Sequence, residues 1–185
     1  MTPVVLILSA GVLATGIAAW TDYRTGLIPN WLTLGVLVAA GVTHAGAAFL
    51  AGGFQAAVYA GLASFAGALF CALAPGVLYW KGAMGGGDLK LFAAIGALYQ
   101  PTLGIQAEMY AFVIAAVIAP ARLAYEGRLF GVLGSTLAVA LNPLRSSEKR
   151  RPLPPESLTW FRLGPAIFAG TALAALQCAF SRLPG

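Results

Sequence analysis

The chain has 185 residues, of which 59% are hydrophobic and only 9% are charged. A soluble domain carries roughly 25% charged residues, so this composition excludes a soluble globular protein and predicts an integral membrane protein. The net charge of +5 does not indicate nucleic-acid binding, because most of the basic residues lie in short connections between apolar runs, as orientation signals do.

The apolar runs are continuous rather than alternating, which predicts membrane-spanning helices of about 20 residues each. We expect an all-α, polytopic integral membrane protein with about six transmembrane helices, forming a single membrane-embedded domain over residues 1–185. The expected spanning helices are about Pro3–Trp20, Trp31–Leu50, Phe54–Trp80, a shorter helix ending near Tyr99, Leu103–Ala121 and Leu163–Phe180. The apolar stretch Leu129–Leu141 is too short to span comfortably and is expected to form an interfacial or re-entrant helix.

Glycine and proline mark the expected ends and breaks of these helices. Gly52-Gly53 and Gln100-Pro101 are expected to form short turns. Pro75-Gly76 is expected to tilt or break its helix. Asn30 is a plausible N-cap for the helix that follows it.

The basic residues predict the orientation in the membrane. Ten of them fall on one set of connections, whereas the other set, Gly52-Gly53 and Gln100-Pro101, has none. The ten are Arg24, Lys81, Lys90, Arg122, Arg128, Arg145, Lys149, Arg150, Arg151 and Arg162. By the positive-inside rule, the first set is cytoplasmic and both termini lie outside.

Few side chains in the chain suggest a metal or cofactor site. Cys71 and Cys178 both lie inside apolar segments, and we interpret them as small packing residues with no disulfide or zinc framework. His44 is expected to be packed or interfacial. Glu108 is expected far in depth from both aspartates, and a proton-relay role is a weak hypothesis for it. We therefore expect no cofactor and no metal.

The loop Lys81–Lys90, which reads KGAMGGGDLK, lies between two long apolar segments. Its glycines, among them Gly85 and Gly87, allow backbone conformations that other residues avoid. Asp88 follows them directly, and an apolar run begins at Leu91. A carboxylate at the mouth of a membrane segment is costly and rarely idle. The alternative is that this carboxylate only caps the next helix.

Asp22 is the other aspartate of the chain, 66 residues before Asp88. The predicted topology places both at the cytoplasmic ends of helices. Asp22 is expected just past the C-terminal end of its helix, where the dipole disfavours a negative charge. Two carboxyls that share a site cannot both ionise easily, so one tends to keep a proton, as in an aspartic protease. The alternative is local pairing of Asp22 with Arg24 and of Asp88 with Lys90.

Three segments resemble those of a known family. Gly85–Lys90 matches the G-x-G-D-x-K pattern of the type IV prepilin peptidases, which are membrane aspartic proteases of the GxGD type. Thr21–Arg24 followed by Ile28–Asn30 resembles that family's first aspartate region, with its D…IPN order. Gly164–Ile167 resembles its late F-G-P-A segment, with Leu163 where Phe is usual.

The resemblance implies a function and a site. Asp22 and Asp88 would be the catalytic residues, and Gly85, Gly87 and Lys90 would support the loop. The substrates would be prepilin or pseudopilin precursors, cut after a short basic leader at the cytoplasmic face of the bacterial inner membrane. The partners expected are this substrate and the lipid bilayer, with no nucleic acid; the oligomeric state is left open.

One departure from the family pattern is informative. Longer members carry an N-terminal domain with paired CxxC zinc motifs, which is linked to methylation of the new N-terminus. No CxxC occurs here, and the first helix runs directly into Asp22. The chain is similar to the short, peptidase-only form of tight-adherence (Flp) pilus systems, so we expect cleavage without N-methylation and no zinc or S-adenosylmethionine site.

Two other functions remain as alternatives. A proton- or cation-coupled carrier could use Asp22 and Asp88 as ion sites, but carriers place such residues near the bilayer midplane, often within an inverted repeat, and neither feature is evident. A non-catalytic scaffold of a secretion machine would tolerate replacement of both aspartates.

Overall fold

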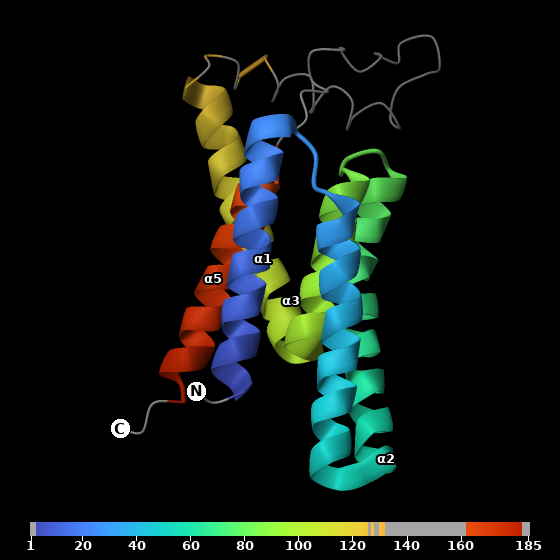
Figure 1. The fold of residues 1–185 in the computed structure, drawn as a ribbon. Helices are drawn as coiled ribbons and strands as arrows, with labels where there is room; N and C mark the ends of the chain where they lie inside the picture. The colour runs from blue at the N-terminus through green and yellow to red at the C-terminus, as the bar shows by residue number, and fades with distance from the viewer. Residues whose placement is uncertain (1–2, 126, 128–129, 132–161, 183–185) are drawn as a thin grey trace, which may run out of the picture. The chain divides into compact units, whose positions relative to one another are not determined.

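The computed structural model describes residues 3–125, 127, 130–131 and 162–182, and its regular elements there are all α-helices (Figure 1). They are α1 (Pro3–Thr25), α2 (Asn30–Trp80), α3 (Gly86–Tyr125) and α5 (Gly164–Phe180). Helices α1, α2 and α3 are long and apolar enough to cross a membrane. The all-helical fold is therefore confirmed for the described residues, and the three long apolar helices are consistent with the expected membrane protein, whereas the count of about six spans stays a prediction. Most of the expected helix Leu129–Leu141 lies outside the described residues.

The chain divides into two compact units. The first consists of residues 1–114 and 162–185, and the second of residues 115–161. The first unit contains α1, α2, α5 and most of α3, and it carries both aspartates.

Helices α2 and α3 each reverse direction part-way along their length (Figure 1). The reversals coincide with two residues of non-helical backbone, Gly53 (φ 76°, ψ −165°) and Gln100 (φ 60°, ψ 175°). Glycine adopts such angles readily, and a residue before proline is pushed out of the helical region. The predicted turns at Gly52-Gly53 and Gln100-Pro101 are thus confirmed. The predicted break near Pro75 is wrong, because Pro75 lies buried inside α2 without a non-helical residue beside it.

Helix α1 continues five residues beyond its predicted end at Trp20. It ends where Gly26 takes a left-handed φ of 69° and its N–H donates to the Asp22 carbonyl at 2.8 Å, which is a glycine C-cap. Hydroxyl groups of the last turns, such as that of Thr25, donate to carbonyls of their own helix. Asp22 therefore lies within the end of α1, not past it, and the prediction that it follows the helix is wrong.

Glycines allow the helices of the first unit to approach closely. A Cβ at Gly67 of α2 would lie 2.0 Å from the Gly96 carbonyl oxygen of α3, and one at Gly170 of α5 would lie 2.4 Å from the Ala111 nitrogen. Such small residues let helix backbones touch where the hydrophobic effect gives little drive for association. Helices α1 and α5 pack along one another (Figure 1). This pairing brings the start of α5 to the end of α1.

Candidate active site

Asp22 is held by the first residue of α5. Its side chain is 7% exposed, and its Oδ2 accepts a hydrogen bond of 2.9 Å from the Gly164 N–H. The first N–H groups of a helix have no intrahelical acceptor and carry partial positive charge. The N-terminus of α5 therefore satisfies and stabilises the carboxylate of Asp22.

Only glycine fits at position 164 without a rearrangement. A Cβ there would lie 2.8 Å from Asp22 Oδ2, 2.9 Å from Asp22 Cβ and 3.2 Å from Ala19 Cα. These distances are all below normal contact, and the last involves backbone that cannot rotate away. The segment that resembles F-G-P-A thus acts on Asp22 directly. The sequence showed the motif but not this contact, because nothing local links residues 142 positions apart.

Asp88 lies in the first turn of α3, two residues after the helix begins at Gly86. The hypothesis that it is the N-cap is therefore wrong in position, although its carboxyl does face the Gly85 backbone. The side chain is partly buried, and its Oδ1 is a buried atom without a hydrogen-bond partner among the described residues. Buried polar atoms are nearly always paired, and exceptions concentrate where chemistry needs them.

The two aspartates lie within electrostatic range of one another. The Asp22 carboxyl acts electrostatically on that of Asp88, although the two come from α1 and α3. The alternative of local pairing is wrong. The Arg24 guanidinium lies over the Trp20 ring, 4.5 Å from its centroid, and Lys90 turns to a different partner.

The segment Ile28–Asn30 contacts the start of α3, which holds Asp88. Lys90 Nζ donates to Asn30 Oδ1 at 2.8 Å, and a Cβ at Gly87 would lie 3.1 Å from Ile28 Cβ. Asn30 is the first residue of α2 and Pro29 stands at its N-cap, so the prediction of Asn30 as the N-cap is wrong. The I-P-N segment after Asp22 and the start of α3 are thereby joined at two points.

The sequence matches the type IV leader peptidase family over residues 8–120. This range is more than half of the chain and includes both aspartates, the segment Ile28–Asn30 and the start of α3. The chain belongs to the type IV leader peptidase family. The searches of curated proteins and of solved structures returned no match.

Membership in the leader peptidase family implies that the chain is a protease. It disfavours the alternative of a proton- or cation-coupled carrier. Type IV leader peptidases process prepilin-type precursors, so the match also supports the resemblance seen in the Gly85–Lys90 and Ile28–Asn30 segments. The matched range stops before α5. The contact of Gly164 with Asp22 is therefore an observation of the structure alone.

Arg162 adds a further link in this leader peptidase. Its guanidinium donates to the Tyr23 carbonyl and lies 6.0 Å from the centroid of the Tyr23 ring. It thus ties the residues before α5 to the end of α1, next to Asp22. The sequence placed Arg162 only as an orientation signal, and no local pattern marks this contact.

The remaining candidate side chains lie elsewhere. His44 bonds the Leu98 carbonyl at 2.9 Å through Nε2, as a packed histidine would. Glu108 is buried beside Cys71, which is a free thiol, as is Cys178. Within the described part of the chain, His, Cys, Asp and Glu form no cluster of three that could hold a metal ion.

Proposed function

We propose that this chain is an aspartic endopeptidase that removes the basic leader of type IV prepilin-like precursors, with Asp22 and Asp88 as its catalytic pair. The observation that carries the proposal is that two carboxyls, from α1 and α3, lie close enough to interact electrostatically in a member of the leader peptidase family. Gly164 supports the assignment because its N–H orients one of them. The unpaired Oδ1 of Asp88 leaves a polar atom for a water molecule or a peptide.

The mechanism needs one proton shared between the two carboxyls. One carboxylate takes a proton from the attacking water, while the other, protonated, donates to the carbonyl oxygen of the scissile peptide. Collapse of the tetrahedral intermediate then breaks the C–N bond, and the leaving amine takes up a proton from the pair. Because the sites are coupled, the protonation belongs to the pair and not to either residue.

The glycine loop would admit the substrate. Gly85 lies beside the Asp88 carboxyl, since a Cβ there would lie 3.1 Å from Asp88 Oδ2, whereas Gly87 is covered by Ile28. An extended peptide could lie against the bare backbone at Gly85, because no side chain holds it off. Lys90 and Asn30, bonded between α3 and the start of α2, would keep Asp88 and the segment after α1 in register.

We place the site at the cytoplasmic face of the bacterial inner membrane, in a topology of six spans with both termini outside. The support is the one-sided distribution of Lys and Arg. Reporter fusions at Gly53 and Ser147 should then report opposite sides of the membrane. The same side for both would contradict this topology.

Cleavage of a candidate prepilin on co-expression tests the proposal. The precursor should lose the mass of its leader with the native chain and keep it with Asp88→Asn at matched expression. We also propose that no methyl group is added, since neither cysteine belongs to a CxxC motif. Mass spectrometry of the product made with S-adenosylmethionine supplied should show the unmodified new N-terminus; an added methyl would refute this part. An unprocessed precursor with the native chain would favour the scaffold alternative.

A further inference from the structure

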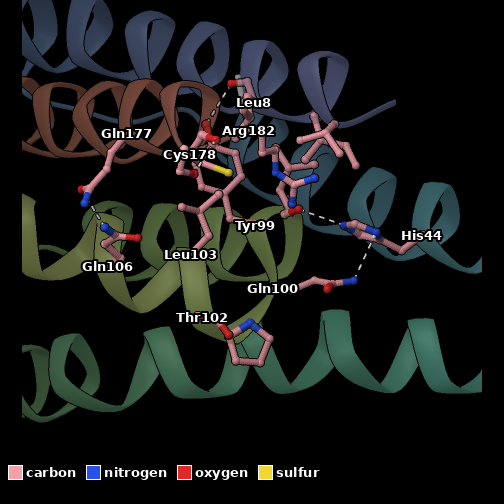
Figure 2. A pocket seen from close by; sticks show the side chains of 15 residues that line it. Leu8, His44, Tyr99, Gln100, Thr102, Leu103, Gln106, Gln177, Cys178 and Arg182 are labelled. Carbon is pink, nitrogen blue, oxygen red and sulfur yellow. Dashed lines mark hydrogen bonds between the residues drawn. The ribbon is translucent and has the colours of Figure 1, made fainter. Parts of the chain in front are cut away.

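A cavity of about 540 Å³ is lined by side chains from the start of α1 and the end of α5, among others (Figure 2). Asp22 lies at the other end of both helices. The cavity is lined by residues of all four described helices and by Arg182, just after α5. Leu8, in its wall, is 14 residues before Asp22 on α1, or about 21 Å along a helix. The cavity is therefore separate from the candidate active site. Its size is in the range of sites that bind small ligands.

One wall of the cavity is fixed by hydrogen bonds. His44 Nε2 lies 2.9 Å from the Leu98 carbonyl oxygen and therefore carries the hydrogen, because a carbonyl can only accept. His44 Nδ1 is then the acceptor for the Gln100 side-chain amide at 3.4 Å. Across the lining, Gln106 donates to Gln177 at 2.8 Å (Figure 2). These polar groups are held in place by protein partners.

Arg182 supplies the positive charge of this cavity. It is the one Lys or Arg, of eleven in the chain, outside the group that predicts the cytoplasmic side. Its side chain lines the cavity, and no carboxylate among the described residues forms an ion pair with it. Figure 2 labels it between the His44–Gln100 pair and the Gln106–Gln177 pair. An arginine so placed is suited to bind an oxygen anion through several N–H groups.

Backbone N–H groups that line the same cavity as Arg182 also favour binding of an anion. The second arm of α3 begins after Gln100, and Thr102 and Leu103 in its first turn line the cavity. Their N–H groups belong to the set that lacks intrahelical acceptors. Gln100 itself has φ 60° and ψ 175°, a region that non-glycine residues adopt only at a cost. The bond of Gln100 to His44 offsets part of this cost and keeps the wall in shape.

The rest of the lining is apolar and follows the helices. Val4, Ile7, Leu98 and Leu103 contribute to it. This end of the helix bundle combines one positive charge, hydrogen-bonded side-chain amides and an aliphatic wall. These groups are complementary to an amphiphile with an anionic headgroup. We propose that this cavity binds the phosphate headgroup of an anionic phospholipid, with Arg182 on the phosphate and the start of an acyl chain along Val4 and Ile7.

The test measures lipid binding to the purified full chain in neutral detergent. The probes are phosphatidylglycerol, phosphatidylcholine and inorganic phosphate, and the readouts are retained lipid by native mass spectrometry and the thermal unfolding midpoint. The variants are Arg182→Gln, which removes the charge, and Arg182→Lys, which keeps it. Lys81→Gln is the matched control, because Lys81 is exposed and lies over the Trp80 ring, away from the cavity.

Phosphatidylglycerol should bind Arg182→Gln about tenfold more weakly than the native chain, as loss of one charged hydrogen-bonding group predicts. Arg182→Lys, which keeps the charge but not the planar set of N–H groups, should bind more weakly than the native chain and more tightly than Arg182→Gln. Lys81→Gln should bind as the native chain does. Equal binding to Arg182→Gln, or an equal loss in Lys81→Gln, would overturn the proposal. Phosphatidylcholine that binds as well as phosphatidylglycerol would overturn the requirement for an anionic lipid. An Arg182-dependent effect of inorganic phosphate alone would support the phosphate site but overturn a lipid as its source.

Discussion

Gly164→Ala introduces the smallest possible side chain at the point where α5 meets Asp22. The added Cβ would lie 2.8 Å from Asp22 Oδ2 and 3.2 Å from Ala19 Cα. Relief requires either rotation of the Asp22 carboxyl or a shift of α5 away from α1. Both changes lengthen the 2.9 Å bond from the Gly164 N–H, which is worth about 1.5–3 kcal/mol for a charged acceptor.

The expected consequences are a modest loss of stability and a large loss of activity. Overpacking by one methyl group costs about 1–3 kcal/mol of folding stability. Displacement of a catalytic group by about 1 Å can cost about 100-fold in rate. We therefore expect kcat/KM for a synthetic prepilin to fall by about 100-fold in Gly164→Ala, while the protein still inserts and purifies.

Two glycines of the same helices serve as matched controls. A Cβ at Gly16 would lie 3.4 Å from the Phe168 ring, which is an ordinary contact, so Gly16→Ala should keep both stability and activity. A Cβ at Gly170 would lie 2.4 Å from the Ala111 nitrogen, so Gly170→Ala should lose stability without a selective loss of activity per folded molecule. Native kcat/KM in Gly164→Ala, measured per folded molecule, would refute the role of this contact.

Three further substitutions test the contacts between Ile28–Asn30 and the start of α3. Gly87→Val should abolish cleavage while the protein accumulates, because even its Cβ would lie 3.1 Å from Ile28; full activity, in the same prepilin assay, would show that the glycines are only a flexible linker. Asn30→Ala and Lys90→Ala each remove one partner of the same 2.8 Å bond, so the double variant should lose no more activity than either single one. Additive losses in this double-mutant cycle would mean that the two residues act separately.

Much of the helical framework could be predicted because its signals are local. The Gly-Gly and Gln-Pro pairs mark the reversals of α2 and α3 through the backbone preferences of single residues. The placement of both aspartates at one end follows from helix lengths and the distribution of basic residues. The prediction of a break at Pro75 was wrong, since α2 continues through this buried proline despite its missing N–H.

The details of the site depended on tertiary contacts that no local pattern encodes. The segment around Asp22 is polar enough to suggest a loop, yet α1 continues through it to the left-handed Gly26. Asn30 is a residue type typical of an N-cap, but its side chain accepts a hydrogen bond from Lys90 of α3. The support of Asp22 by Gly164 arises only when α5 packs along α1. The motifs were visible in the sequence, whereas their mutual contacts were not.

The catalytic pair is tested most directly by asparagine at each aspartate. Asp22→Asn keeps an oxygen that can accept from the Gly164 N–H, so folding and insertion should persist while the general base and the shared proton are lost. A purely structural role for Asp88 in the first turn of α3 would instead make Asp88→Asn nearly silent, because asparagine keeps the size of the side chain and an accepting oxygen. The native chain should show a bell-shaped pH profile whose limbs belong to the pair.

The decisive measurement is turnover of a synthetic prepilin by the purified native chain, Asp22→Asn, Asp88→Asn and the double variant, reconstituted in lipid at equal amounts of folded protein. Both single variants should lose cleavage, and the double variant should be no worse than either, because the two carboxyls act as a unit. Retained turnover in either single variant would contradict the aspartic-protease mechanism.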